Sequence, residues 1–319
     1  MHSSKSRQPR ILRAGVIGIG AFGRHHAAKY ASMDDVELAG IADPSADARR
    51  VAVTQHDAAV HADWRDLLGE VDIVSVCSPA STHANIVRAF LNAGAHVLVE
   101  KPIATTLREA DQLIALAAAS DRVLTVGHQE RFVFARTGLL DYGEPPLSVE
   151  SWRLGPWTGR GGDVSVVLDL MIHDLDLVHR LVPGDVVDVQ ANGRSTKSRH
   201  ADEVTASIEF ENGSVARLTA SRISSFRRRG MRAVYSDGVI EIDFIARTVR
   251  NTTKRPLQPV LLDDPLGESV AAFVHAARTN EDAVVRPEEA RTALETALLI
   301  EDACQDMVVP RATGTYARA

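Results

Sequence analysis

Short apolar segments alternate with stretches of helical periodicity throughout residues 11–127, and this alternation constrains the fold more than any other feature of the sequence. Such a pattern is typical of a parallel sheet covered by helices on both faces. The expected strands are Leu12–Gly18, Val36–Ala42, a weaker one near Ala59, Asp72–Cys77, His96–Val99 and Val123–Val126, and the expected helices are Phe22–Met33, Ala46–Gln55, Thr82–Ala93 and Leu107–Ala119. We therefore expect a doubly wound α/β domain.

From about Pro146 onward the apolar residues alternate with a period of two, which predicts antiparallel strands. The turn sequences Glu211-Asn212-Gly213 and Ser236-Asp237-Gly238 predict hairpins. One long helix is expected at Val166–Val182, and two more close the chain, at Ser269–Arg278 and Pro287–Asp306. We expect an α/β domain over residues 1–128 and an α+β domain with an open antiparallel sheet over residues 129–319, with the closing helices as candidates to pack back on the first domain.

Composition narrows the class of protein. A length of 319 residues fits about two domains, and a formal charge of −6 gives no general attraction to nucleic acid or to an anionic membrane. No apolar run reaches the roughly 18 residues of a membrane span, and the polar, basic stretch Met1–Arg10 is expected to be a short leader and not a secretory signal. Cys77 and Cys304 form no CxxC pair, which predicts a reduced, cytoplasmic protein.

A glycine motif, Gly18-Ile19-Gly20-Ala21-Phe22-Gly23, leaves the first apolar segment and opens a helical period. In this strand–turn–helix context GxGxxG binds the diphosphate of a dinucleotide. Gly18 would allow the tight turn, Gly20 the approach of the diphosphate, and Gly23 close packing of the helix on the strand, with Ala21 and Phe22 also expected at the cofactor. A packing turn without a ligand is the alternative.

Asp43 lies 20 residues beyond Gly23, at the predicted end of the second strand. An acidic side chain at this position binds the ribose 2′-hydroxyl of NAD and repels the 2′-phosphate of NADP. The sequence therefore predicts NAD, while the neighbouring Arg49 and Arg50 keep NADP open.

Further unusual residues stand where the other predicted parallel strands end, which is where doubly wound sheets bind ligands. Those expected near the cofactor are Ser78, Pro79, His83 and Glu100, and those expected near the substrate are Gln129 and Arg131. Lys101 directly follows an apolar strand, and partial burial would lower its pKa and suit it to proton transfer or to stabilising an alkoxide. A surface lysine paired with Glu100 is the alternative.

One narrow face of the predicted helix Val166–Val182 is polar. At about 100° per residue, the side chains within about 60° of one another are those of Asp169, His173, Asp176 and Arg180. Because the remaining circumference is almost wholly apolar, we expect a buried helix that lines a polar cavity, in which Asp169 orients His173. An ordinary amphipathic helix with a lean polar face is the alternative.

The remaining expectations concern a metal and the substrate. His173, Asp174 and His179 invite a metal site, but they point apart on the helical wheel, so no metal is expected. The further candidates for substrate contact are Trp152, Arg153 and Asp176, and the triplet Arg227–Arg229 meets either an anionic group or solvent. His25 and His26 are interpreted as structural or adjacent to the cofactor.

Taken together, these segments resemble the Gfo/Idh/MocA oxidoreductase family nearly from end to end. The segments that carry the resemblance are Gly18–Gly23, Ser78–His83, Asn92–Pro102, Asp169-x-x-x-His173-Asp174 and, more faintly, Arg286–Ala290. The resemblance implies a Rossmann domain, an open sheet that often forms dimer or tetramer contacts, and NAD(P)-linked oxidation or reduction of a secondary alcohol of a sugar or cyclitol. It also implies that the catalytic set is Lys101, Asp169 and His173.

The segment Gly127–Phe132 and the strand around Glu241-x-Asp243-Phe244 are similar to those of nucleotide-sugar 3-dehydrogenases. The expected reaction is hydride transfer between NAD and a sugar-type substrate such as UDP-N-acetylglucosamine, with His173 as the base and Lys101 at the alkoxide, or with these roles exchanged. The alternatives are an inositol or free-aldose dehydrogenase, a non-catalytic NAD(P)-binding sensor or scaffold, and a metal-dependent hydrolase. A homodimer or homotetramer through the open sheet is expected.

Overall fold

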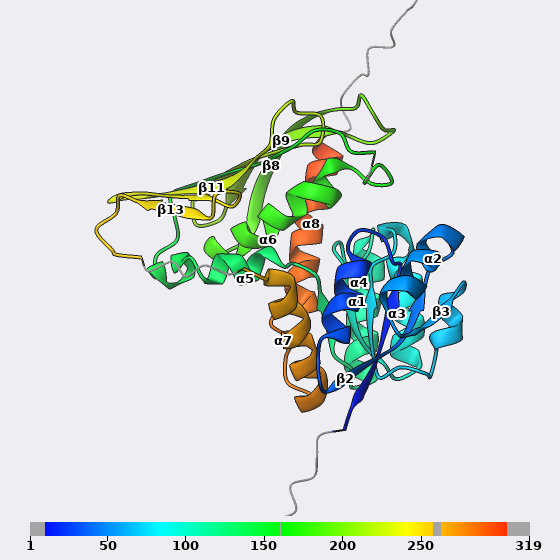
Figure 1. Ribbon diagram of the computed structural model, residues 1–319. Coiled ribbons are helices and arrows are strands. Elements are labelled where there is room, and N and C mark those ends of the chain that lie inside the picture. Colours follow the sequence, from blue (N-terminus) through cyan, green and yellow to red (C-terminus); the bar gives the residue numbers. More distant parts are fainter. Residues whose placement is uncertain (1–9, 160, 258–262, 305–319) are drawn as a thin grey trace, which may run out of the picture. The chain divides into compact units, whose positions relative to one another are not determined.

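The computed structural model describes residues 10–159, 161–257 and 263–304 and divides into two compact units (Figure 1). The first unit comprises Met1–Leu140 and Gln258–Glu295, and the second comprises Asp141–Leu257 and Thr296–Ala319. A domain boundary after residue 128 stays a prediction. The expected leader and the end of the last predicted helix lie outside the described residues.

The first unit is built on a parallel sheet with the strand order β3-β2-β1-β4-β5-β6. Its strands are β1 (Leu12–Ile17), β2 (Val36–Ala42), β3 (Ala59–His61), β4 (Ile73–Val76), β5 (His96–Val99) and β6 (Leu124–Val126). The order reverses between β1 and β4, which creates the switch point where doubly wound sheets bind their ligands. The predicted doubly wound domain is confirmed.

Helices connect and cover these strands. They are α1 (Gly23–Ala31), α2 (Ala46–Gln55), α3 (Ala80–Asn92), α4 (Leu107–Ala119), α5 (Glu130–Ala135) and, from the end of the chain, α7 (Pro265–Thr279), with short helices η1 (Trp64–Leu67) and η2 (Leu139–Tyr142). Right-handed crossovers place α1 and α2 on one face of the sheet and α3 and α4 on the other. Helix α7 contacts α1 and adds Val270, Phe273 and Val274 to the core beside β1.

The second unit contains a sheet with the strand order β13-β12-β11-β7-β10-β9-β8. Its strands are β7 (Ser148–Leu154), β8 (Val186–Arg194), β9 (Glu203–Phe210), β10 (Val215–Ser221), β11 (Arg228–Tyr235), β12 (Gly238–Asp243) and β13 (Thr248–Asn251). The predicted hairpins join β9 to β10 and β11 to β12. Strands β7 and β10 run parallel, so the sheet is mixed and only mostly antiparallel, because a helical crossover separates β7 from the hairpins that follow.

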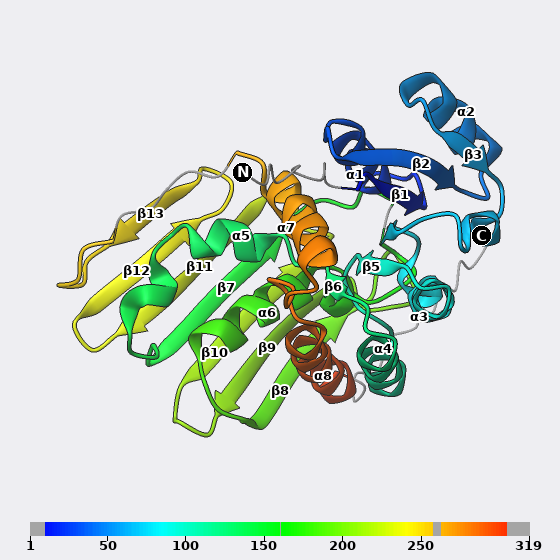
Figure 2. The same ribbon diagram turned by 90° about the horizontal axis from the view of Figure 1, so that it is seen from below.

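One face of this sheet is covered by a helix and the other is open. Burial alternates strictly along β7, where Val149, Ser151 and Arg153 are buried and Trp152 is half-buried. Figure 2 shows the strands side by side with α6 (Ile172–Leu181) over them. Arg153 bonds to Asp174 of α6, which identifies its face as the covered one. Trp152 therefore lies on the open face.

The predicted helix Val166–Val182 has two parts. Residues Val167–Met171 form a π-helical turn, η3, and α6 follows from Ile172. The spacing of 100° per residue therefore fails across Asp169, because a π-helix has more residues per turn than an α-helix. Helix α8 (Pro287–Ala303) ends the described chain. Within the described residues no helix combines the length and apolarity that a bilayer crossing needs.

Candidate active site

The glycine motif forms a tight turn in which two glycines pack against backbone atoms and one, Gly20, has free space around its Cα. Gly18 has φ +84°, and a Cβ there would lie 2.9 Å from the backbone of Cys77 and Ser78. A Cβ on Gly23 would overlap the carbonyl oxygen of Gly18, whereas a Cβ on Gly20 would meet nothing within 4 Å. Only Gly20 therefore leaves space at the backbone for a diphosphate.

The start of α1 is suited to an anion. Phe22 stands at the N-cap, and no side chain among the described residues caps the helix there. The N–H groups of Arg24 and His25 donate to the carbonyl oxygens of Gly20 and Phe22, but the aligned peptide dipoles of α1 still give this end a partial positive charge that favours phosphate. The side chain of Phe22 is 46% exposed and that of Ala21 is half-buried.

Asp43 follows β2 directly and contacts the glycine turn. Its Oδ2 accepts a hydrogen bond from Ile19 N at 2.8 Å, and its Oδ1 accepts one from Ser45 N at 2.8 Å. Arg49 donates to the carbonyl oxygens of Asp43 and Pro44. The guanidinium of Arg49 is bound to backbone carbonyl oxygens, and the Asp43 carboxylate lies at the glycine turn. A carboxylate there binds the 2′-hydroxyl of NAD and repels a 2′-phosphate, so this arrangement favours NAD.

Two glycine substitutions separate folding from cofactor binding. Gly23→Ala forces α1 away from the turn and is expected to destabilise the fold by about 3 kcal/mol and to abolish NADH binding. Gly20→Ala meets no protein atom, so thermal unfolding is expected to stay unchanged while the dissociation constant for NADH rises by roughly tenfold or more, about 1.4 kcal/mol. Thermal unfolding and NADH fluorescence titration measure both effects. An unchanged NADH affinity in Gly20→Ala would contradict this role of the turn.

Lys101 follows β5, half-buried, in a segment that the protein fixes from several sides. His83 is 1% exposed, and its ring nitrogens lie 2.7 Å from Pro102 O and 2.9 Å from Ser78 O. His83 thus links the segment after β4 to the residue after Lys101. Both of its ring nitrogens contact buried backbone carbonyl oxygens. Pro79 is the exposed N-cap of α3.

Glu100, Gln129 and Arg131 are also held inside the first unit. The Glu100 carboxylate is 7% exposed and accepts a hydrogen bond from Gln129 Nε2 at 2.9 Å. Arg131 is 7% exposed and forms an ion pair with Glu289 of α8. These contacts give all three side chains a structural partner, whatever else they bind.

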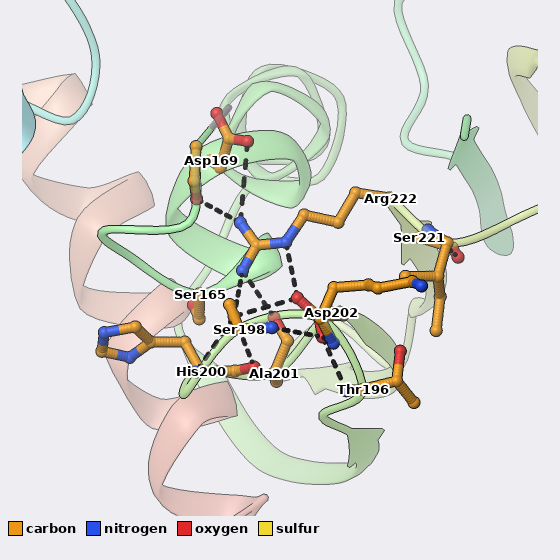
Figure 3. Close-up of polar contacts among 12 residues, drawn as sticks. Ser165, Asp169, Thr196, Ser198, His200, Ala201, Asp202, Ser221 and Arg222 are labelled. Carbon is orange, nitrogen blue, oxygen red and sulfur yellow. Dashed lines mark hydrogen bonds and ion pairs between the residues drawn. The ribbon is translucent and has the colours of Figure 1, made fainter. Parts of the chain in front are cut away.

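In the second unit, Asp169 lies beside a buried arginine (Figure 3). The guanidinium of Arg222, at the end of β10, has its Nη1 3.9 Å from Asp169 Oδ2. Arg222 also donates to the carbonyl oxygens of Gly161 and Val164, which belong to the loop before η3. A Cβ on Gly161 would overlap the Asp169 carboxylate, so this loop and Asp169 are packed closely together.

Asp202 is the main anion of Arg222. It is fully buried and accepts Arg222 Nε at 2.9 Å and the backbone N–H groups of Thr196 and Ser198 at 2.7 and 3.1 Å. Although burial favours the neutral acid, the backbone N–H groups of Lys197, Thr196 and Ser198, together with the Arg222 guanidinium, hold the pKa of Asp202 well below its usual range. The ion pair between Arg222 and Asp202 therefore connects the end of β10, the loop 196–202 and the loop 161–164, and it lies next to Asp169 of η3.

Arg222→Met is expected to destabilise the protein strongly, because it leaves the Asp202 carboxylate buried without its cation. The expected loss is about 3–5 kcal/mol in the free energy of unfolding. Arg222→Lys, which keeps a charge but not the planar set of donors, should lose less. Urea unfolding of both variants measures this, and equal stability of Arg222→Met and the unaltered chain would disprove the role.

The other side chains of the predicted polar stripe differ in exposure. Asp169 and His173 are half-buried, Asp176 is 1% exposed and Arg180 is exposed. Because Asp169 lies in the π-helical turn η3, its place relative to His173 does not follow from α-helical spacing, and a shared cavity-lining stripe stays a prediction.

Asp174 and His179, which the wheel pointed away from His173, have separate partners. Arg153 is 3% exposed and its Nη2 donates to Asp174 Oδ1 at 2.8 Å, and His179 Nε2 lies 2.8 Å from Thr296 Oγ1. Within residues 10–159, 161–257 and 263–304, no three His, Cys, Asp or Glu side chains are grouped as metal ligands would be. On the open face, Arg228 stacks on Trp152 with 4.0 Å from Cζ to the ring centroid.

Comparison with known proteins decides the family. The profile described as an oxidoreductase family with an NAD-binding Rossmann fold matches residues 12–128, and the profile of the GFO/IDH/MocA C-terminal domain matches residues 131–241. The chain belongs to the Gfo/Idh/MocA oxidoreductase family. The predicted family, the NAD cofactor and the dehydrogenase class are thereby confirmed.

Among its relatives in this family is UDP-N-acetylglucosamine 3-dehydrogenase of Acidithiobacillus ferrooxidans, 38% identical over 239 residues, which cover 75% of this chain and 76% of the relative. A solved structure of that enzyme has a TM-score of 0.85 and covers 92% of this chain and 97% of its own. Myo-inositol 2-dehydrogenase of Thermotoga maritima is 28% identical over 300 residues, 83% of this chain and 82% of the relative. Scyllo-inositol dehydrogenase of Lactobacillus casei, solved with NAD(H) and scyllo-inositol, shares the fold at 20% identity, with a TM-score of 0.78 and coverage of 92% and 97%.

Sequence reasoning named the family's motif residues but missed their buried partners. Arg222 and Asp202 carried no signal beyond their positions at the ends of expected strands. His26 was noticed only as structural or adjacent to the cofactor, although its position three residues after Gly23 places it on the helix that carries the phosphate loop.

Proposed function

We propose that this member of the Gfo/Idh/MocA family oxidises a nucleotide sugar, UDP-N-acetylglucosamine, at its 3-hydroxyl with NAD. The observation that carries the substrate is the 38% identity to the Acidithiobacillus ferrooxidans enzyme of that name, over three quarters of both chains. The residues that the sequence assigns to the chemistry, Lys101, Asp169 and His173, are all present.

The proposed mechanism removes a proton from the hydroxyl while the attached carbon loses a hydride. The glycine turn and Asp43 would hold NAD, which would supply the hydride acceptor when bound. His173 takes the hydroxyl proton, and Asp169 stabilises the imidazolium that results. Lys101 stabilises the developing alkoxide through its charge, or relays the proton if the roles are exchanged.

Arg222 supports this proposal from inside the second unit. Because its guanidinium holds the Gly161–Val164 loop and lies 3.9 Å from Asp169, it fixes the carboxylate that orients the base. Fixed groups lower the reorganisation needed during the reaction, which is the usual source of electrostatic catalysis.

A substrate panel tests the proposal. NADH formation from NAD is expected with UDP-N-acetylglucosamine and absent with free N-acetylglucosamine and myo-inositol. Turnover of myo-inositol alone would establish the second candidate, an inositol dehydrogenase, which the Thermotoga maritima relative favours. Binding of NADH without turnover of any sugar would establish a sensor or scaffold.

Assembly and location form part of the same proposal. The open face of the second sheet exposes Thr205, Glu209 and Arg217 and also carries half-buried Trp152, and we assign to it the contact in a homodimer or homotetramer. A cytoplasmic location is supported by the two cysteines, which are both free thiols in the described structure.

A further inference from the structure

His26 is a buried histidine that the proposed mechanism does not use. It lies on α1 and is 1% exposed. Its Nε2 lies 3.1 Å from Glu100 Oε1, and its Nδ1 lies 3.0 Å from Ser75 Oγ, which in turn lies 2.7 Å from the hydroxyl of Tyr30. A buried polar chain thus runs from α1 through β4 to the residue before Lys101.

The contact between His26 and Glu100 is ionic. Burial lowers the pKa of His26, but Cys77 and the Glu100 carboxylate outweigh it and raise the pKa to about 10. Burial alone would raise the pKa of the Glu100 carboxyl, but His26 and Lys101 lower it below its usual value, so Glu100 is an anion that faces His26. An imidazolium donates through both nitrogens, which satisfies Glu100 and Ser75 together.

Glu100 is confined on its other side as well. Gln129 Nε2 donates to the same Oε1 at 2.9 Å. A Cβ on Gly127 would lie 2.8 Å from the Glu100 carboxyl carbon, so the carboxylate packs directly on the backbone after β6. The residue before Lys101 is therefore held between α1 and the end of β6.

We propose that His26 is a positioning residue for Lys101, which through Glu100 ties the end of β5 to the helix that carries the phosphate loop. The catalytic role of Lys101 belongs to the proposed function, so the kinetic part of this inference rests on it. The position of Lys101 does not, and it can be measured without any substrate.

Two replacements of His26 separate its two contacts. The amide nitrogen of Gln reaches about as far as Nε2, so His26→Gln retains a donor for Glu100. The amide nitrogen of Asn reaches about as far as Nδ1, so His26→Asn retains the contact with Ser75 and loses Glu100. His275→Asn, at a histidine of α7 that is 67% exposed, is the control for the substitution itself.

The first measurement is the acetylation rate of each lysine, followed by mass spectrometry in the protein without substrate. The chain has only five lysines, and Lys197 and Lys254 of the second unit serve as internal references. The rate at Lys101 is expected to rise several-fold in His26→Asn and to stay near the unaltered value in His26→Gln and His275→Asn.

The second measurement is the split between kcat and KM. In His26→Asn, kcat is expected to fall by up to roughly 10²-fold while the KM for the sugar and the affinity for NADH change little, because a misplaced group slows the chemistry more than it weakens binding. His26→Gln should recover most of kcat. A purely structural role would lower the stability of both variants alike and leave kcat unchanged.

The outcomes are distinguishable. If the unaltered protein oxidises no sugar, the proposed function fails, while the acetylation rates still judge the position of Lys101. Equal rates at Lys101 in His26→Asn and His26→Gln would overturn the inference. If His26→Asn does not fold because Glu100 is left as a buried charge, the double variant His26→Asn/Glu100→Gln removes that charge, and the inference requires it to fold and still show rapid acetylation of Lys101.

Discussion

Replacing Lys101 with Met is expected to lower kcat by roughly 10²–10⁴-fold while NADH still binds. Methionine keeps the apolar stem, so the fold of the segment after β5 should survive. The substitution removes the ammonium group, and with it the charge that is proposed to stabilise the alkoxide. The proposed cofactor contacts are those of the glycine turn and Asp43, which the substitution does not touch.

Steady-state NADH formation and an NADH fluorescence titration on the same preparation measure this. Lys254→Met, at an exposed lysine of the second unit, is the control and should keep full turnover. A Lys101→Met variant that turns over at the unaltered rate would remove the lysine from the mechanism.

His173→Ala is expected to lower kcat by a similar factor, roughly 10²–10⁴-fold, because the hydroxyl proton then lacks its base. The matched control is His179→Gln, which alters the other histidine of α6 and keeps an amide donor near Thr296. The control should retain its turnover, and His173→Ala should bind NADH normally. Equal activity of the two variants would argue that α6 contributes no base.

Asp169→Asn tests whether the Asp169 carboxylate acts on His173, through the pH dependence of kcat/KM. In the proposed mechanism the Asp169 carboxylate stabilises the imidazolium of His173, and the base acts in its neutral form. Asp169→Asn removes that stabilisation and makes protonation of the base less favourable, so the acidic limb of kcat/KM should move to lower pH. An acidic limb that stays in place, or moves upward, would separate Asp169 from the base.

The periodicity of the first unit predicted its fold closely, because buried parallel strands are nearly continuous apolar runs and leave little ambiguity. Strands Val36–Ala42 and His96–Val99 have the predicted limits, and the weak signal near Ala59 is the edge strand β3. The second sheet was expected to be antiparallel throughout. The direction of β10 relative to β7 depends on which strands become neighbours in the sheet, and the local hydrophobic pattern of a strand does not determine its neighbours.

Site residues could be predicted where the local backbone conformation requires one residue type. They could not be predicted where a side chain's role depends on which residues pack against it. Gly18 and Gly23 are forced by the turn itself, so their motif sufficed. Arg153 was a substrate candidate in sequence, but it pairs with Asp174 across the sheet and helix, a contact between residues 21 apart. The π-helical turn at Asp169 also escaped a wheel drawn for an α-helix.

The proposed function requires hydride transfer from a secondary carbon of a nucleotide sugar to NAD. It is tested most directly by mixing the protein with NAD and UDP-N-acetylglucosamine that carries deuterium at C3, and analysing the cofactor by mass spectrometry. We expect reduced cofactor with one deuterium on the nicotinamide ring and a 3-keto sugar product. Reduced cofactor without deuterium would contradict hydride transfer from C3. So would the absence of any reduced cofactor from a protein that binds NADH.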